Sequence, residues 1–200
     1  MRPDTITIVF ALKKTNTDPQ KALAGLQERA ASVLARMAEA TSGAATMKMC
    51  GASVRPVSQG KSDDGDAVMY AVVVDGSIDV RLAPEQDYWA RSRLIASITQ
   101  ATRRLTAPSK DDASRPDMRF DEPQITLKDP EVHRAKLVER WAKRAREFGD
   151  AVQAAAAPLY MLDCAPPAPI ELRPISLEEV GLSLPVSCRV DTPRSAASPK

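Results

Sequence analysis

Hydrophobic and polar positions follow two different periods along the first part of the chain. Thr5 to Leu12 alternates in steps of two and is rich in β-branched residues, which predicts a strand. Asp18-Pro19 suits a helix N-cap and first turn, and the apolar residues after it recur in steps of three and four until Gly43. The chain therefore opens with a strand and a long amphipathic helix.

The middle of the chain predicts two more strands and a second helix. Met47 to Val57 is strand-like, and Ala67 to Leu82 is the most hydrophobic segment, with a loop expected between them at Gln59 to Asp66. Asp75-Gly76 indicates either a hairpin turn or a bulge in one long strand. A helix opening at Pro84 would carry on its buried face Tyr88, Ile95, Ile98 and Leu105.

The last part predicts one interrupted strand, a third helix and further strands. Met118 to Leu127 is strand-like but contains Pro123. Asp129-Pro130 repeats the cap-plus-proline opening, and the helix after it carries an apolar stripe that we expect in the core: Val138, Trp141, Ala145, Phe148 and Val152. Strands are then expected at Pro158 to Cys164, Ile170 to Ile175 and Leu182 to Val190.

These elements follow the order β-α-β-β-α-β-α-β-β and predict an α+β fold. Strands that are neighbours in sequence can pair antiparallel, and each long helix needs a sheet face to cover. We therefore expect a mixed, largely antiparallel sheet covered on one side by long helices. A single domain would span residues 5–191, and residues 192–200 would form a disordered tail of small, polar and basic residues.

Composition and charge narrow the class of protein without naming its role. Lys and Arg total 28 against 26 acidic residues, and this formal charge of +2 is too balanced to predict nucleic-acid binding by the whole chain. No stretch approaches the roughly 18 consecutive apolar residues of a membrane span, and the start does not resemble a signal peptide. The 3 cysteines are odd in number and widely spaced, so we expect no disulfide framework and a cytoplasmic location.

The order of elements, with several segments inside it, resembles the SIMPL-domain family of bacterial oxidative-stress-defence and periplasmic proteins, which also includes a kinase-associated signalling protein. The resemblance spans Thr5 to Asp191, and the segments that carry it are Asp18–Ala22, Tyr70–Val74, Pro123–Leu127, Glu131–Phe148 and Leu182–Val190. It implies an α+β domain without enzymatic activity that in some members assembles into rings or channel-like homo-oligomers. It supplies no active-site residues. Members of the family usually begin with an export signal, which we do not expect in this chain, and the family's glycine-rich features of the second half are not obvious here.

No residue pattern predicts catalysis, a cofactor or a metal. His133 has no nucleophile or carboxylate partner indicated for it. Zinc would require close pairs of Cys or His, and the chain contains none. There is also no glycine-rich phosphate loop and no nucleophile elbow. We expect no enzyme, no cofactor and no metal site.

The third predicted helix holds a local concentration of basic residues. Its basic side is a candidate interaction face that consists of Arg134, Arg140, Lys143 and Arg144. A solvated helix face explains this side most simply, because acidic residues are interspersed. The alternative is a face that binds an acidic partner; nucleic acid is disfavoured because no aromatic residues are interleaved with the charges.

The cysteines offer a second candidate site. Cys50 and Cys188 lie in predicted strands, where we expect them to behave as small core hydrophobes. A redox thiol at Cys50, Cys164 or Cys188 is the alternative, and it would require an exposed, low-pKa cysteine.

The sequence thus predicts a non-enzymatic interaction or scaffold protein of the SIMPL type, with a link to stress response implied by the resemblance. We expect a homo-oligomer, with another protein as a further partner. The alternative hypothesis is a redox-responsive or small-ligand-binding module that uses a cysteine or a pocket between sheet and helices.

Overall fold

The computed structural model describes residues 1–57, 68–107, 116–154, 161–165 and 168–191. The predicted loop at Gln59 to Asp66 and the predicted disordered tail lie outside the described residues. The chain divides into two compact units. We call Arg2–Thr126 with Ser176–Glu179 the sheet unit, and Met1, Leu127–Ile175 and Val180–Lys200 the hairpin unit.

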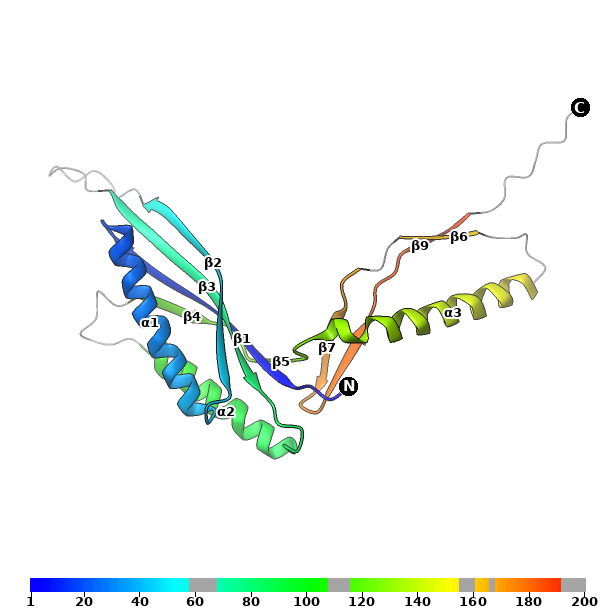
Figure 1. Ribbon diagram of the computed structural model, residues 1–200, viewed down its shortest axis with the longest axis horizontal. Helices are drawn as coiled ribbons and strands as arrows, with labels where there is room; N and C mark the ends of the chain where they lie inside the picture. Colours follow the sequence, from blue (N-terminus) through cyan, green and yellow to red (C-terminus); the bar gives the residue numbers. More distant parts are fainter. Residues whose placement is uncertain (58–67, 108–115, 155–160, 166–167, 192–200) are drawn as a thin grey trace, which may run out of the picture. The chain divides into compact units, whose positions relative to one another are not determined.

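The sheet unit contains an antiparallel sheet and two long helices (Figure 1). Along the chain its elements are β1 (Thr5–Asn16), α1 (Pro19–Ala40), β2 (Ala45–Val57), β3 (Met69–Arg81), α2 (Tyr88–Thr106), β4 (Asp117–Phe120) and β5 (Gln124–Thr126). The strands lie in the order β2-β3-β1-β4, with β5 also paired to β1, and every one of these pairs is antiparallel. This is the split β-α-β arrangement, and the predicted α+β class is confirmed.

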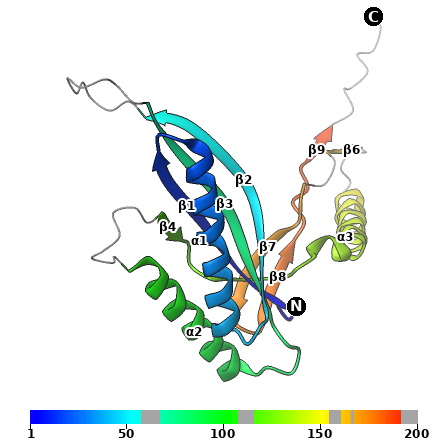
Figure 2. The same ribbon diagram turned by 60° about the vertical axis from the view of Figure 1, so that its left-hand side comes forward.

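The core of this unit lies between one face of the sheet and the helices. Figure 2 shows α1 and α2 side by side over the sheet. The period-two pattern of β1 explains this face, because alternate side chains of a strand point to opposite sides. The buried set on β1 is Ile6, Ile8, Phe10 and Leu12, and the helices cover it with Leu26, Val33, Met37 and Ile98.

Asp75-Gly76 neither turns a hairpin nor bulges, because β3 continues through both residues as one strand. The irregularity lies in the neighbouring strand β2, between Met49 and Gly51, opposite this point. Gly76 packs under the ring of Phe10: a Cβ atom there would lie 2.5 Å from Phe10 Cζ and 2.6 Å from the backbone oxygen of Lys48. The hairpin alternative is therefore wrong, and Gly76 allows close packing.

The helix starts show where local signals succeed and fail. α1 begins as predicted, since the Asp18 side chain accepts a hydrogen bond of 2.8 Å from the Gln20 backbone N–H. α2 begins at Tyr88 and not at Pro84, because Asp87 is its N-cap and accepts from the Ala90 N–H at 2.7 Å. Tyr88, predicted to face the core, is exposed and contacts the ring of Trp89 edge to face.

The hairpin unit contains a long helix and two pairs of short strands. Its elements are the 3₁₀ turn η1 (Pro130–His133), α3 (Arg134–Ala154), β6 (Met161–Cys164), β7 (Glu171–Ser176), β8 (Glu179–Ser183) and β9 (Cys188–Asp191), of which only the strand ends Ser176 and Glu179 belong to the sheet unit. β6 pairs with β9 and β7 pairs with β8. The single predicted strand Leu182 to Val190 is therefore two strands, since Pro185 between them lacks an N–H for a continuous ladder.

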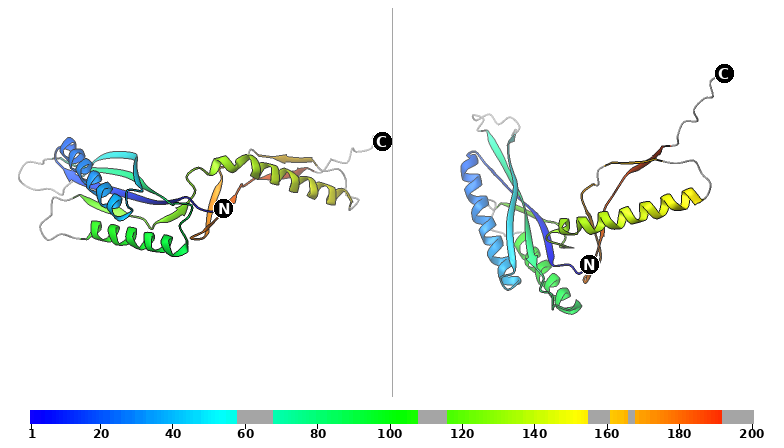
Figure 3. Two further views of the ribbon diagram at one scale, coloured as in Figure 1. Left: turned by 60° about the horizontal axis from the view of Figure 1, so that its bottom comes forward. Right: turned by 45° about the vertical axis from the view of Figure 1, so that its right-hand side comes forward.

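The apolar stripe of α3 does not form a core as predicted. Figure 3 shows α3 as one uninterrupted helix, yet none of residues 134–151 is buried and Phe148 is 57% exposed. Within the described part of the hairpin unit, the buried apolar residues are Leu127, Ile170 and Val180. Strands of four to six residues offer too little sheet surface to bury a helix of 21 residues.

Candidate interaction sites

The predicted interaction face on α3 divides into an anchored residue and exposed ones. Arg134 donates from Nη2 to Glu131 Oε1 at 2.9 Å and from Nη1 to the Ala168 carbonyl at 3.2 Å. The hydrogen bond from Arg134 lowers the pKa of Glu131, and a backbone hydrogen bond at Ile170 and the charge of Arg134 act in the same direction. Arg134 thus fixes the start of α3 in addition to carrying charge.

The other three predicted residues, Arg140, Lys143 and Arg144, all lie on exposed helix surface. Lys143 Nζ lies 3.9 Å from Glu147 Oε1, and both side chains are mostly exposed. An exposed pair of this kind contributes little to stability because water and salt screen it. The structure therefore leaves these three cations available for a partner without showing a site built around them.

Two cysteines form a disulfide, contrary to the prediction. Cys164 and Cys188 are directly opposed in the register of β6 and β9, and their sulfur atoms are bonded. Cys188 and the free Cys50 are both exposed, so neither is the core hydrophobe that we predicted. The pairing was missed because the sequence predicted β8 and β9 as one strand, which gave no indication of the register between β6 and β9. The predicted cytoplasmic location rested on the expectation of no disulfide, and this bond removes that support.

An apolar groove runs between α1 and β2 in the sheet unit. It has a volume of about 670 Å³, and none of its eleven lining residues is charged. We call it the α1–β2 groove; its lining includes Gln20, Leu23, Gln27, Leu34, Met47 and Met49. Met49 remains 53% exposed although it lies on the helix-covered side of the sheet. The helix layer thus stops short of β2, and an apolar strip stays open to solvent.

β2 is also an edge strand, because β3 is its one neighbour among the strands of the described residues. Lys48, Arg55 and Pro56 lie along it, and the bulge between Met49 and Gly51 interrupts its ladder. Charged residues, proline and bulges all disfavour the addition of another strand to an edge. The uncovered face of β2 is therefore better suited to a partner than its free edge.

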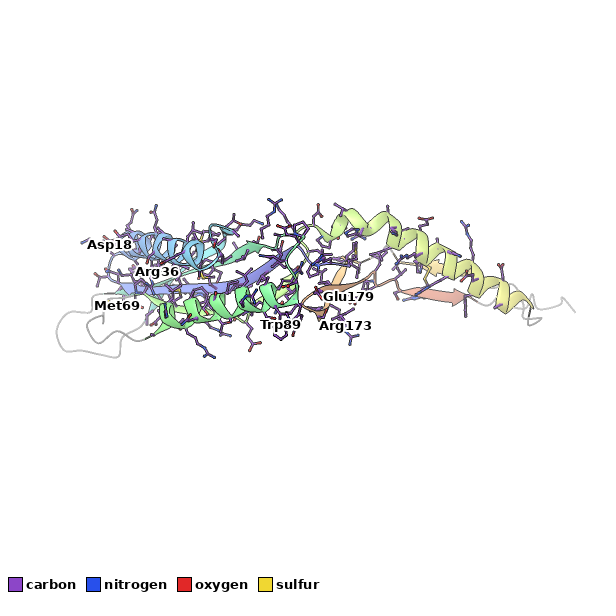
Figure 4. All side chains as sticks on the ribbon, turned by 90° about the horizontal axis from the view of Figure 1, so that it is seen from below. Asp18, Arg36, Met69, Trp89, Arg173 and Glu179 are labelled. Atoms are coloured by element: carbon purple, nitrogen blue, oxygen red, sulfur yellow. A yellow bond between two sulfur atoms is a disulfide. The ribbon has the colours of Figure 1, made fainter. Side chains whose placement is uncertain are left out.

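A polar pocket, which we call the α1–α2 pocket, lies on the other flank of α1. Its volume is about 560 Å³, and three arginines line it: Arg29 and Arg36 from α1, and Arg104 from α2. The sequence analysis missed these residues because they come from two helices. One signal was available, since Arg29 and Arg36 are seven residues apart and share a helix face. Figure 4 labels Arg36 on α1 and Asp18 at its start.

Arg91 is a buried charge that sequence reasoning also missed. Its side chain is 1% exposed and donates to the carbonyls of Gln86 at 3.2 Å, Pro3 at 3.2 Å and Leu177 at 2.8 Å. Burial lowers the pKa of Arg91, the nearby charge of Arg2 lowers it further, and Glu178 opposes both effects. Arg91 therefore holds together three separate backbone segments of the sheet unit.

Among the described residues, no cluster of three or more His, Cys, Asp or Glu could hold a metal ion. The helices of that same part of the chain include none long and apolar enough to cross a membrane. No protein-family model matches the chain, and no curated protein sequence matches it.

Proposed function

We propose that this chain is a non-enzymatic scaffold protein of the SIMPL type that assembles with copies of itself. The observation that carries the proposal is the α1–β2 groove, an uncharged apolar strip that the helix layer of the sheet unit leaves uncovered. An exposed apolar groove is one of the features by which a protein–protein interface is recognised. The resemblance to the SIMPL-domain family supports self-assembly and adds the link to stress response.

A second copy is a suitable partner because the groove contains no charge that would repel its own image. The edge of β2 is less suitable, since two antiparallel copies would bring cations such as Lys48 and Arg55 together and would meet at a bulge. We therefore expect copies to meet through the groove and its exposed rim residues, such as Leu23 and Met49. The sheets of two copies would therefore not join into one continuous sheet through β2.

Light scattering behind a sizing column, over a concentration series, tests this proposal. Met49→Glu should break the assembly of the full-length protein, because a carboxylate would be buried without a partner at the interface. Val9→Glu is the matched control. The side chain of Val9 is 48% exposed, a fraction similar to the 53% of Met49, but it lies on the opposite face of the sheet. A wild-type mass near 21.6 kDa at all concentrations would refute self-assembly.

The alternative is a redox-responsive module, and the Cys164–Cys188 disulfide favours it. Cys188 is exposed, so a small thiol can reach this bond. Such a bond also favours an oxidising compartment over the predicted cytoplasm. Labelling of free thiols with a mass tag at cell lysis tests the compartment. Labelling at Cys50 alone would support an oxidised protein, whereas labelling at all three cysteines would support the cytoplasm.

The redox role requires in addition that the disulfide changes the behaviour of the protein. The oligomer mass should shift when the bond is reduced, and Cys50→Ser should show the same shift because Cys50 is outside the bond. An oligomer mass that does not respond to reduction would leave the disulfide a purely structural role.

A further inference from the structure

We propose that the α1–α2 pocket binds a small soluble molecule that carries a phosphate group. This inference is independent of self-assembly, because the pocket lies on the flank of α1 that faces α2, whereas the α1–β2 groove lies on the flank that faces β2. It rests on the placement of three arginines around one cavity. No basic residue of α3 belongs to it.

Two polar stripes line the pocket, one on each helix. α1 contributes Arg29, Ser32 and Arg36 in steps of three and four, and α2 contributes in the same steps Ser97, Gln100 and Arg104. Residues three and four apart share one face of a helix, so both stripes face the space between the helices. Guanidinium, hydroxyl and amide donors thus surround one cavity.

The wall of the pocket is held in place by one of its own arginines. Arg29 donates from Nη2 to the carbonyl of Leu105 at 2.6 Å and so joins the middle of α1 to the end of α2. The two helices also pack directly on each other. A ligand would therefore enter a preformed site and would not have to order the helices first.

The charge of the pocket favours an anion. Its three arginines face one carboxylate, Glu39, which leaves a net charge of +2. Arg36 lies 3.4 Å from Glu39, but their side chains are 68% and 74% exposed, so solvent screens this pair. Arg36 can therefore exchange Glu39 for a ligand at little cost. The planar guanidinium matches the oxygens of a phosphate with two parallel hydrogen bonds.

The size of the pocket points to an organic phosphate or a diphosphate. Its volume of about 560 Å³ falls within the usual range for small-molecule sites and exceeds the need of one inorganic anion. The serines and Gln100 can hydrogen-bond to the remainder of such a molecule. A concave site between two helices also suits a small ligand better than a flat or extended nucleic acid.

Calorimetric titration of the full-length protein with inorganic pyrophosphate and with glycerol phosphate tests the proposal. We expect saturable binding with one site per chain, above any heat from sodium chloride at equal ionic strength. Arg36→Gln and Arg104→Gln should each weaken binding by roughly tenfold to a hundredfold, as expected for the loss of a charged hydrogen bond. Glu39→Gln should tighten it, because the competing carboxylate is removed.

Arg103→Gln is the matched control, since Arg103 is an exposed neighbour of Arg104 outside the pocket. Equal weakening in this variant would show a general charge effect and overturn the proposal. A second arm uses phosphatidylcholine vesicles with and without phosphatidic acid. Binding to the phosphatidic-acid vesicles alone would assign the site to a lipid headgroup and overturn the soluble ligand. Absence of binding to any phosphate probe would also overturn it.

Discussion

Arg91 is a charged residue whose side chain is fully buried in the sheet unit. It is a buried guanidinium whose acceptors are three backbone carbonyls, and its Nη2 atom has no hydrogen-bond partner among the described residues. The charge of Glu178 raises the pKa of Arg91 and only partly offsets the lowering by burial and by Arg2. Burial of this charge costs desolvation free energy. Its hydrogen bonds in return connect backbone segments that are distant in sequence.

Replacement of Arg91 should therefore destabilise the sheet unit. Arg91→Met keeps the length of the side chain but leaves the buried carbonyl of Pro3 and the part-buried carbonyl of Leu177 without this donor. We expect a loss of about 2–4 kcal/mol in the free energy of unfolding, measured by urea denaturation. Arg93→Met, at an exposed position two residues along α2, should change it by less than about 0.5 kcal/mol. Equal effects of the two variants would contradict the anchoring role.

Glu131 provides a test of electrostatics at the start of α3. Its pKa is lowered mainly by the hydrogen bond from Arg134, so Arg134→Gln should raise it toward the ordinary value of 4.5. A carboxylate with a lowered pKa stabilises the folded state above its unfolded pKa, and this contribution disappears as the pH falls through the lowered value. NMR titration of the Glu131 carboxyl carbon measures the shift. Arg140→Gln should leave it unchanged, and a pKa that stays low in Arg134→Gln would refute the assignment.

At the scale of elements, the contact between β1 and β3 depends on a missing side chain. Gly76→Ala would place a methyl group against Phe10 and against the backbone of Lys48, which cannot move away easily. We expect a loss of about 1–3 kcal/mol in unfolding free energy by thermal or urea denaturation. Gly51→Ala in β2 is the control, since open space surrounds its Cβ position and the change should be nearly neutral. A neutral Gly76→Ala would show that Phe10 adjusts freely.

The elements that could be predicted from sequence are those whose signals are local. β1 and α1 follow from period and from the Asp18 cap, both of which act within a few residues. The start of α2 was misplaced because Pro84 resembles a first helical residue, whereas the cap is Asp87. The arginines of the α1–α2 pocket could not be found in this way, because the packing of two helices, and not sequence spacing, brings Arg104 beside Arg29.

The same limit explains the errors in the hairpin unit. The apolar stripe of α3 was a correct sign of an amphipathic helix, but amphipathicity does not say how much of the stripe is covered. Phe148 remains exposed because the neighbouring strands are short. The disulfide depended on the register of β6 with β9, and Cys164 and Cys188 are 24 residues apart in sequence. Register between distant strands is a tertiary property.

At the scale of the whole molecule, the two units should differ in their dependence on reduction. Closing a loop of 24 residues by a disulfide stabilises a fold by about 3.5 kcal/mol in the chain-entropy model. The described part of the hairpin unit contains this bond and few buried apolar residues, whereas the sheet unit has a large core of its own. Hydrogen exchange with and without reductant should therefore show protection lost in β6 and β9 but kept in β1 and β3.

The control for this experiment is Cys50→Ser under the same reductant, since Cys50 lies in the sheet unit and outside the disulfide. It should behave as the wild type does. Equal loss of protection in β1 and β3 would show that the two units unfold as one.

The irregular edge of β2 has a consequence during protein synthesis. β2 leaves the ribosome before β3, the strand that pairs with it, so for a time β2 is an unpaired segment of 13 residues. Neighbouring nascent chains on one messenger would present the same strand at high local concentration, which favours amyloid-like stacking. Lys48, Arg55, Pro56 and the bulge at Cys50 interrupt such stacking. We therefore expect the edge of β2 to protect the chain from such stacking before it folds.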